Sequence, residues 1–449
     1  MNYVIQNARA IAGHPSADSL RIVDGTILEI GTRLSATFDE QLIDARDCVI
    51  YPGLINTHHH LAQSVLKGVP AGLNAELGEW LASVPFRFWP HIDAELMYDA
   101  AMIGLSELLR SGATTCCDHH YLYHAASTPE LEDALWAAAD TLGVRLLLCR
   151  GGATTVGSHR GLASAGIVPE SIEQMISGLE YSLKRYHQAG SNAMRRLVVA
   201  PTSLMHSSSP DDLRQLARFA RAHDLKLHSH LLEVGFDEIQ AQKEYGMTAV
   251  EYAESVEWLG SDVWFAHLVK ANAADIAKLA ATGTSISHCP TSNLRLGSGI
   301  APVTTMQQAG MRITVGVDGS ASAESASMIQ ELNLAWLLQR GVHGASATEL
   351  SQCLDWGSSN AATMLGLDDI GTIAIGKACD IVLYDISHYR YQGLHSVEQA
   401  PLLCGEPVMV KHSFVNGRRV IVDGDIVGLD EEKLRHSVQD GIQRLRSRL

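Results

Sequence analysis

The feature that most constrains the fold is a repeated alternation of short apolar runs and amphipathic segments between residues 50 and 370. The apolar runs have the length and composition of buried strands, and the segments between them have the periodicity of helices. The eight predicted strands cover 49–58, 113–118, 144–149, 195–201, 225–230, 263–267, 284–288 and 312–317. Eight strands separated by helices predict an α/β fold, a distorted (β/α)8 TIM-like barrel. An open doubly wound sheet fits less well, because no glycine-rich phosphate loop follows the first strand.

Two of the intervening helices have clear boundaries in the sequence. The segment 95–110 carries apolar residues on one helical face, and Gly112 is placed to end it. A second helix is predicted to open at Ser209, because Pro210 and two aspartates follow. A serine N-cap, a first-turn proline and early acids all favour a helix start.

The two ends of the chain have a different texture from the middle. Short strand-like pieces joined by tight turns, such as Asp24-Gly25 and Asn416-Gly417, occur near both termini. We therefore expect one small β-sandwich domain built from both chain ends. The predicted boundaries are 1–50 with 371–430 for this composite domain, 51–370 for the barrel and 431–449 for a C-terminal helix.

Composition limits the kind of partner. The chain has 34 Lys plus Arg against 50 Asp plus Glu, a formal net charge of -16. This balance argues against nucleic acid or an anionic membrane as partner, since both need a basic face. The apolar runs are too short for membrane spans, the N-terminus has no signal-like core, and the eight cysteines lack a framework spacing. We expect a cytoplasmic homo-oligomer that acts on a small molecule.

The first predicted strand ends in three consecutive histidines. Side chains alternate along a strand, so His58 and His60 point the same way and His59 points the other way. Two imidazoles on one face can share a metal ion, whereas a solvated histidine cluster would need no ion. The choice between these readings depends on whether other strands deliver further ligands to the same place.

Polar residues follow each of the eight predicted strands. Barrel enzymes build their sites from the carboxyl ends of the strands, so these residues are expected to meet at one mouth. The strand ends are 57–60, 118–121, 150–152, 201–203, 228–233, 266–267, 288–293 and 316–320.

We assign His58, His60, His230 and Asp318 as the ligands of one divalent metal ion. Three neutral imidazoles and one carboxylate suit Zn2+, with Fe2+ as the alternative. Such an ion lowers the pKa of a bound water to roughly 7, which gives hydroxide at neutral pH.

Three of these strand-end residues are candidates for catalysis. Asp318 can accept the proton of the attacking water, Glu233 can hand a proton to a ring nitrogen, and His267 can hydrogen-bond the hydroxide or the oxygen of a tetrahedral adduct. Each has a plain structural alternative: a turn former, a helix-start acid and a satisfied core histidine. The coincidence of all of them at matched strand ends favours the catalytic interpretation.

These motifs resemble the amidohydrolase superfamily, and more narrowly its cytosine and guanine deaminase-like branch. The resemblance implies a distorted barrel with one metal, commonly zinc, and hydrolytic deamination of a heterocycle. One departure is Ala323, where relatives often have Asn. The segments that carry the resemblance are 52–60, 230–233, 266–267, 288–293, 317–320 and 371–382.

The residues after the fourth predicted strand bear on the number of metal ions in the site. Hydantoinase-like and dihydroorotase-like relatives carry a lysine there that bridges two metals, whereas this chain reads Ala200-Pro201-Thr202-Ser203. The resemblance therefore implies one metal rather than two.

Five further residues resemble those of deaminases that act on oxidised guanine and pterin rings. Gln63 would pair with the amide edge of a 2-amino-4-oxo ring, and Trp80 would either close the pocket or pack on the barrel rim. His120, Arg150 or Ser203 would recognise a second oxo group on the distal ring.

The expected substrate is a pterin such as isoxanthopterin, with 8-oxoguanine as the alternative. 8-Oxoguanine deaminases of this pattern carry Cys-Ser-Pro-Phe where this chain has Thr202-Ser203-Leu204-Met205. Triazine-type and adenosine-like aminohydrolases are more distant alternatives. A non-catalytic assembly or binding relative would be expected to have lost metal ligands, and this chain keeps them.

Overall fold

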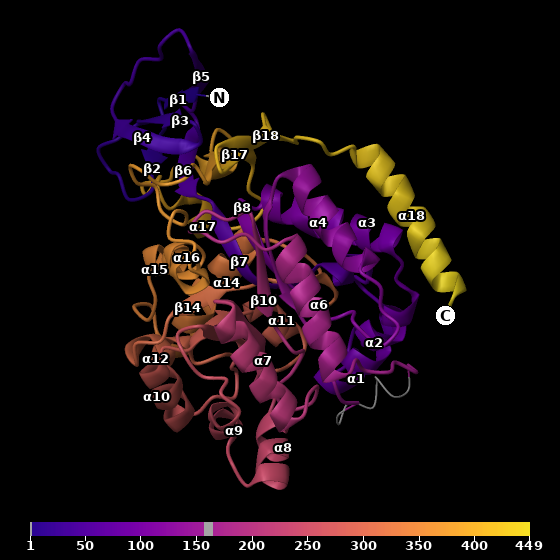
Figure 1. The fold of residues 1–449 in the computed structure, drawn as a ribbon. Helices are drawn as coiled ribbons and strands as arrows, with labels where there is room; N and C mark the ends of the chain where they lie inside the picture. The colour runs from indigo at the N-terminus through magenta and orange to yellow at the C-terminus, as the bar shows by residue number, and fades with distance from the viewer. Residues whose placement is uncertain (1, 157–164) are drawn as a thin grey trace.

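A computed structural model describes residues 2–156 and 165–449, and its central element is a curled parallel sheet (Figure 1). The strand order is β14-β13-β12-β11-β10-β9-β8-β7-β15. The strands are β7 (Leu54–His60), β8 (Ala113–His120), β9 (Arg145–Arg150), β10 (Arg195–Val199), β11 (Lys226–Leu231), β12 (Val263–His267), β13 (Ser285–His288), β14 (Ile313–Val315) and β15 (Asp318–Gly319).

The barrel ends in two short strands, β14 inside the predicted eighth strand and β15 directly after that strand. β14 pairs with β13 at one edge, while β15 pairs with β7 at the other, with Asp318 opposite His59. Gly316 lies at the break, where a Cβ atom would stand 2.7 Å from the Cβ atom of His58. The predicted distorted barrel is confirmed.

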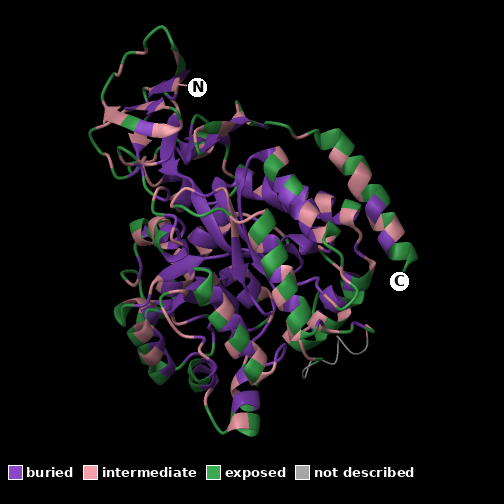
Figure 2. Cartoon of the chain, in the orientation of Figure 1, coloured by how far each residue is buried: buried purple, intermediate pink, exposed green. Residues whose placement is uncertain are grey.

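Helices cover the outside of this sheet, with their buried faces toward the strands and their exposed faces outward (Figure 2). The helix predicted over 95–110 is α3 (Ala94–Arg110), and the one predicted to open at Ser209 is α7 (Pro210–Ala222), whose Asp212 N–H donates to the Ser209 hydroxyl. The other helices are α4 (Glu130–Leu142), α6 (Ile172–Arg185), α8 (Phe236–Tyr245), α9 (Ala249–Ser255), α10 (Ala273–Thr282), α11 (Pro290–Arg295), α12 (Val303–Gln308), α14 (Met328–His343), α15 (Leu350–Trp356) and α16 (Ser359–Leu365).

Two antiparallel-rich sheets are built from the chain ends. Tyr3, Ile50, Ile381 and Phe414 share one buried core between them, and the rings of Tyr3 and Phe414 meet edge to face at 5.3 Å. One sheet has the order β4-β3-β1-β5 and the other β19-β18-β17-β16-β6-β2. Their strands are β1 (Asn2–Gln6), β2 (Ala10–Ile11), β3 (Ser19–Val23), β4 (Thr26–Gly31), β5 (Glu40–Asp44), β6 (Cys48–Pro52), β16 (Ile381–Asp385), β17 (Val410–Val415), β18 (Arg418–Val422) and β19 (Asp425–Ile426).

The single strand predicted over 49–58 is wrong, because the structure has two strands there. β6 ends at Pro52 in the terminal sheet and β7 begins at Leu54 in the barrel. Gly53 lies at the crossing, where a Cβ atom would overlap the side chain of Thr114. A continuous apolar run therefore passes from one sheet into the other at a residue that only glycine fits.

The last helix, α18 (Glu431–Ser447), lies at the outer side of the molecule and runs beside α3 (Figure 1). The Ser437 hydroxyl donates to the Asp99 carboxylate at 2.6 Å, and Gly441 lies against Leu96. Within the described ranges, no helix combines the length and apolar character needed to cross a membrane.

Candidate active site

A cavity of about 920 Å³ opens at the carboxyl ends of the barrel strands. It is lined by residues of β7, β11, β12 and β15, by the loop after β10, and by α1 (Leu77–Ser83). Of the residues predicted for the site, those that line the cavity are His60, Gln63, Trp80, Ser203, His230, Glu233, His267 and Asp318.

Two of the predicted metal ligands donate a hydrogen bond from Nδ1 to a backbone carbonyl oxygen. His60 Nδ1 lies 2.7 Å from the carbonyl oxygen of His119, and His230 Nδ1 lies 2.6 Å from that of Thr202. A carbonyl only accepts, so each Nδ1 carries the proton. Each Nε2 atom is therefore left with a lone pair for a metal ion.

His58 reaches the same state through a second histidine. His228 Nδ1 donates to the carbonyl oxygen of Trp264 at 3.0 Å, which leaves His228 Nε2 as an acceptor. His58 Nδ1 lies 2.8 Å from that Nε2 atom and must be the donor. The lone pair of His58 is thus also on Nε2, a buried atom without a hydrogen-bond partner among the described residues.

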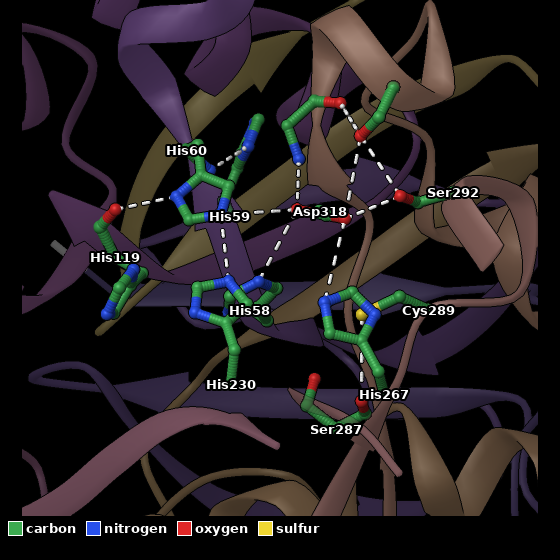
Figure 3. A network of polar contacts seen from close by, with 12 residues as sticks. His58, His59, His60, His119, His230, His267, Ser287, Cys289, Ser292 and Asp318 are labelled. Atoms are coloured by element: carbon green, nitrogen blue, oxygen red, sulfur yellow. Dashed lines mark hydrogen bonds and ion pairs between the residues drawn. The ribbon is translucent and has the colours of Figure 1, made fainter. Parts of the chain in front are cut away.

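These lone pairs converge with one carboxylate oxygen (Figure 3). Asp318 Oδ1 lies 3.4 Å from His58 Nε2 and 3.3 Å from His60 Nε2, and His60 Nε2 lies 3.3 Å from His230 Nε2. A tetrahedral ion with ligand bonds of about 2.0–2.1 Å needs ligand atoms about 3.3 Å apart. The donor set and its spacing fit one divalent metal, and the nitrogen-rich composition suits Zn2+.

The protonation states also fit a metal site. Burial lowers the pKa of His60 to about 3 and that of His230 well below its usual range, so both imidazoles are neutral. Burial alone would raise the pKa of Asp318. The surrounding histidines, His58 above all, outweigh burial and hold this pKa well below its usual range, so the carboxylate is ionised.

Asp318 presents its second oxygen to other groups. Asp318 Oδ2 accepts a hydrogen bond from the Ser292 hydroxyl at 2.5 Å and lies 4.0 Å from His267 Nε2. The backbone of Asp318 is left-handed, with φ 61°, as is that of His267, with φ 76°. Such conformations in non-glycine residues concentrate at functional sites.

His267 and Glu233 form a pair beside the metal donors. His267 Nδ1 donates to the Asn293 side-chain oxygen at 2.9 Å, so its Nε2 atom faces Glu233 Oε2 at 3.6 Å. Burial raises the pKa of Glu233 to about 7. The Glu233 carboxyl can therefore both hold and release a proton near neutral pH.

The substrate residues divide into two groups. Gln63, Trp80 and Ser203 line the cavity. The Gln63 amide nitrogen donates to the Tyr121 hydroxyl at 3.1 Å, which leaves a buried Oε1 acceptor without a hydrogen-bond partner among the described residues.

His120 and Arg150 are not among the described residues that line this cavity. His119 faces the metal histidines, so the next residue along β8 points the other way, and the His120 ring packs against Tyr123. Arg150 forms a buried ion pair with Glu170 at 2.8 Å, and its guanidinium lies 4.0 Å from the centre of the Tyr123 ring. Both side chains support the outside of the barrel wall.

Sequence reasoning missed several residues around the site. His228 could have been found, because it lies two residues before His230 on the same face of β11. His119 carries a possible ligand atom within 4.8 Å of those of His60 and His230. His206 lines the cavity from a turn and Asp237 from the first turn of α8, and no strand periodicity places either side chain there.

Comparison with known proteins places the chain in a family. A family profile described as the Amidohydrolase family matches residues 49–427. An isoxanthopterin deaminase from an unknown prokaryotic organism is 42% identical, over 96% of this chain and 94% of the relative. An 8-oxoguanine deaminase from Pseudomonas aeruginosa is 36% identical, over 93% of this chain and 92% of the relative.

Solved structures agree with these matches. An amidohydrolase from an environmental sample of the Sargasso Sea has a TM-score of 0.86 at 38% identity, covering 100% of this chain and 99% of its own. A mutant atrazine chlorohydrolase from Arthrobacter aurescens TC1, complexed with zinc and atraton, has a TM-score of 0.90 at 25% identity, covering 98% and 100%. The chain belongs to the amidohydrolase family.

Proposed function

We propose that this protein is a metal-dependent hydrolytic deaminase of a 2-amino-oxo heterocycle, with isoxanthopterin or a related pterin as the favoured substrate. The observation that carries the proposal is the convergence of three Nε2 lone pairs and Asp318 Oδ1 beside the buried Glu233–His267 pair. The 42% identity to a protein named isoxanthopterin deaminase supports the choice of ring.

His58, His60, His230 and Asp318 would hold the metal, which when bound supplies an activated water as nucleophile. The two oxygens of Asp318 then have separate tasks. Oδ1 faces the ligand nitrogens, whereas Oδ2 faces Ser292 and the side of His267. We propose that Asp318 takes the proton released by the attacking water.

Glu233 would act on the ring of the substrate. Its pKa of about 7 leaves a large fraction protonated at neutral pH, so it can protonate the ring nitrogen next to the attacked carbon. Protonation makes this carbon more electrophilic. When the tetrahedral adduct collapses, the bond from this carbon to the exocyclic nitrogen breaks and ammonia leaves with the proton that Asp318 took up. The hydroxyl proton of the adduct returns to Glu233 as the carbonyl group forms.

Gln63 would fix the orientation of the ring. Its Oε1 atom, which has no hydrogen-bond partner in the described part of the chain, is an acceptor in the cavity wall, and the amide edge of a 2-amino-4-oxo ring offers an N–H donor. His267 Nε2, on the side of the ring opposite Asn293, would accept a hydrogen bond from the attacking water.

8-Oxoguanine is the second candidate substrate, and the 36% identity to a protein named 8-oxoguanine deaminase favours it. Ammonia release monitored by ultraviolet absorbance separates the candidates. The panel is isoxanthopterin, pterin, 8-oxoguanine, guanine and cytosine. We expect isoxanthopterin to have the largest kcat/KM, and turnover of guanine or cytosine alone would overturn the oxidised-ring proposal.

Metal content tests the catalytic reading against a non-catalytic one. We expect about one equivalent of metal in the purified protein, and removal by a chelator should abolish ammonia release until Zn2+ is restored. Protein that folds without binding any divalent metal would contradict the enzymatic proposal.

We also propose a cytoplasmic location and a homo-oligomeric state. The eight cysteines are free thiols, and seven of them are buried, which is usual for a protein of a reducing compartment. Light scattering on the purified protein would measure the oligomeric state.

A further inference from the structure

Glu233 does not point where strand alternation would send it. Side chains alternate along β11, so a strand that continued past Leu231 would place His230 and Glu233 on opposite faces. Both residues line the cavity instead. The backbone of Leu232, which lies between them, is left-handed with φ 54°. This turn brings Glu233 back to the side of His230.

The left-handed turn at Leu232 is held from two sides. A leucine meets a steric cost in this conformation, because its Cβ atom comes close to the following carbonyl oxygen. The Leu232 N–H donates to Asp237 Oδ2 at 2.6 Å, and the Leu232 carbonyl oxygen accepts from the N–H of Lys270 at 2.9 Å. The second partner is a backbone group, whereas the first is a side chain that a substitution can remove.

Asp237 is well placed to hold this turn. It lies buried in the first turn of α8, and neither the proposed metal site nor the proposed proton transfers use it. Its other oxygen, Oδ1, lies 3.0 Å from Nε2 of His206, which is in the turn that follows β10. With one partner at each oxygen, the carboxylate has a fixed orientation. It therefore links the end of β11 to the start of α8 and to the loop after β10.

The position of Glu233 matters for the proton transfer assigned to it. A general acid acts only within hydrogen-bond reach of the atom that it protonates, and a misplacement of about 1 Å can cost about 100-fold in rate. The Glu233 carboxyl now lies 3.6 Å from His267 Nε2, beside the metal donors. A change in the backbone of Leu232 would move this carboxyl away from the reacting ring.

We propose that Asp237 is a positioning residue that holds the Leu232 turn and so aims Glu233 at the ring nitrogen of the substrate; the inference rests on the proposed function. Asp237 takes no part in the proton transfer itself. It acts through the Leu232 N–H, so it contributes to turnover only while Glu233 is present to be aimed. This dependence separates Asp237 from a residue that only stabilises the fold.

The test substitutes Asp237→Asn, which keeps the size of the side chain but leaves one oxygen for two partners, the Leu232 N–H and His206 Nε2. The measured quantities are kcat and KM for isoxanthopterin and the bound metal. We expect kcat to fall about tenfold or more, since a misplaced acid loses part of the roughly 10²–10⁴ that general acid–base catalysis provides. KM should change by less than about threefold, and the metal content should stay the same.

A second variant, Asp237→Ser, removes both carboxylate oxygens. It should show the same fall in kcat with little change in KM, and it takes the place of the asparagine variant if that protein does not fold. Unchanged kcat in a folded variant of Asp237 would overturn the inference and leave the proposed function intact.

A double-mutant cycle asks whether Asp237 acts through Glu233. In the Glu233→Gln background, Asp237→Asn should lower the remaining kcat by less than about twofold, because no acid is left to aim. A residue with a merely structural role would lower kcat by the same factor in both backgrounds. Equal factors would therefore overturn the inference.

The matched control is Glu238→Gln. Glu238 is the next residue in the same turn of α8, and its carboxylate also accepts a backbone N–H, that of Ala249 at 2.9 Å. Glu238 is not among the described residues that line the cavity. Its variant should keep the kcat and KM of the wild type. A loss of kcat as large as that of Asp237→Asn would contradict the inference.

The wild-type enzyme separates this inference from the function on which it rests. Ammonia release from isoxanthopterin or 8-oxoguanine supports the proposed function whatever the variants of Asp237 do. Release from neither ring contradicts the proposed function, and the inference with it.

Discussion

At the residue scale, the Nδ1 atoms of the metal-site histidines determine what their Nε2 atoms can do. Carbonyl oxygens hold His60 and His230, while His228 holds His58 in the same tautomer. These contacts pre-arrange the lone pairs, so binding an ion requires little reorganisation of the ligands. The site is thus defined by its hydrogen-bond acceptors as much as by its ligands.

The substitution Asp318→Asn should separate the role of residue 318 as a metal ligand from its role as a general base. The asparagine keeps an oxygen that can face His58 and His60 but loses the acceptor for the water proton. We expect metal to remain largely bound while kcat falls at least about a hundredfold, because general-base catalysis is worth roughly 10²–10⁴. Metal analysis and ammonia release measure the two effects, and full activity in the variant would refute the role of Asp318.

His228→Phe should lower the affinity for the metal ion without removing a ligand. Phenylalanine can keep the stacking on Trp264, where the ring centroids lie 4.4 Å apart, but it cannot accept the His58 Nδ1 proton. We expect metal affinity to fall about 10- to 100-fold, the usual cost of losing a ligand's hydrogen-bond partner. Competition with a chromogenic chelator measures the affinity. Unchanged affinity in a folded variant would show that His58 needs no such support.

At the scale of elements, Gly53 is where one apolar run leaves the terminal sheet and enters the barrel. Gly53 N–H donates to the Asp380 carbonyl oxygen at 2.8 Å, which ties the crossing to the residue before β16. The nearby buried ion pair between Arg145 and Asp380 also joins the barrel to the terminal sheet. Strand β6 and strand β7 are therefore locked at their junction by packing as well as by hydrogen bonds.

Gly53→Ala should destabilise the protein, because the added methyl overlaps Thr114. Overpacking of this kind costs about 1–3 kcal/mol. Denaturant unfolding measures the loss, and the double variant with Thr114→Ala should recover part of it. Gly341→Ala in α14, where nothing lies within 4 Å of the added atom, is the control and should be neutral or stabilising. Equal effects at the two glycines would contradict the packing argument.

Element types were predictable from the sequence, whereas breaks within them were not. The strand–helix alternation identifies the barrel because burial on both sides of a parallel sheet requires apolar runs. The breaks at Gly53 and Gly316 depend on contacts with Thr114 and His58, which are distant in sequence. The directions of His120 and Arg150 also depend on register, because one residue of shift reverses the face of a strand side chain.

At the scale of the whole molecule, buried carboxyls set the pH dependence of stability. Burial raises the pKa of Glu331 in α14 to about 8, from 4.5 in the unfolded chain. Between these values the folded protein holds a proton that the unfolded chain has released, so stability falls as pH rises through this window. Burial likewise raises the pKa values of Asp118 and Glu233 to about 7.

The substitution Glu331→Gln should reduce the loss of stability that accompanies rising pH. Glutamine keeps a side-chain oxygen to accept the Thr291 N–H, a bond of 3.0 Å in the wild type, and has no proton to lose. We expect the difference in unfolding free energy between pH 5 and pH 8 to be smaller in the variant. Denaturant titrations of metal-free protein measure it without a contribution from metal release. If the unfolding free energy falls with pH equally in the two proteins, Glu331 does not contribute to the pH dependence of stability.

The separate strand β15 also has a consequence for synthesis of the chain. His58 and His60 lie on the first barrel strand, while Asp318 lies on β15, which pairs with that strand and closes the barrel. During translation His58 and His60 leave the ribosome long before Asp318, and domains fold as units once their chain is complete. The proposed ligand set is therefore complete only once β15 has paired with β7, at the step that closes the barrel.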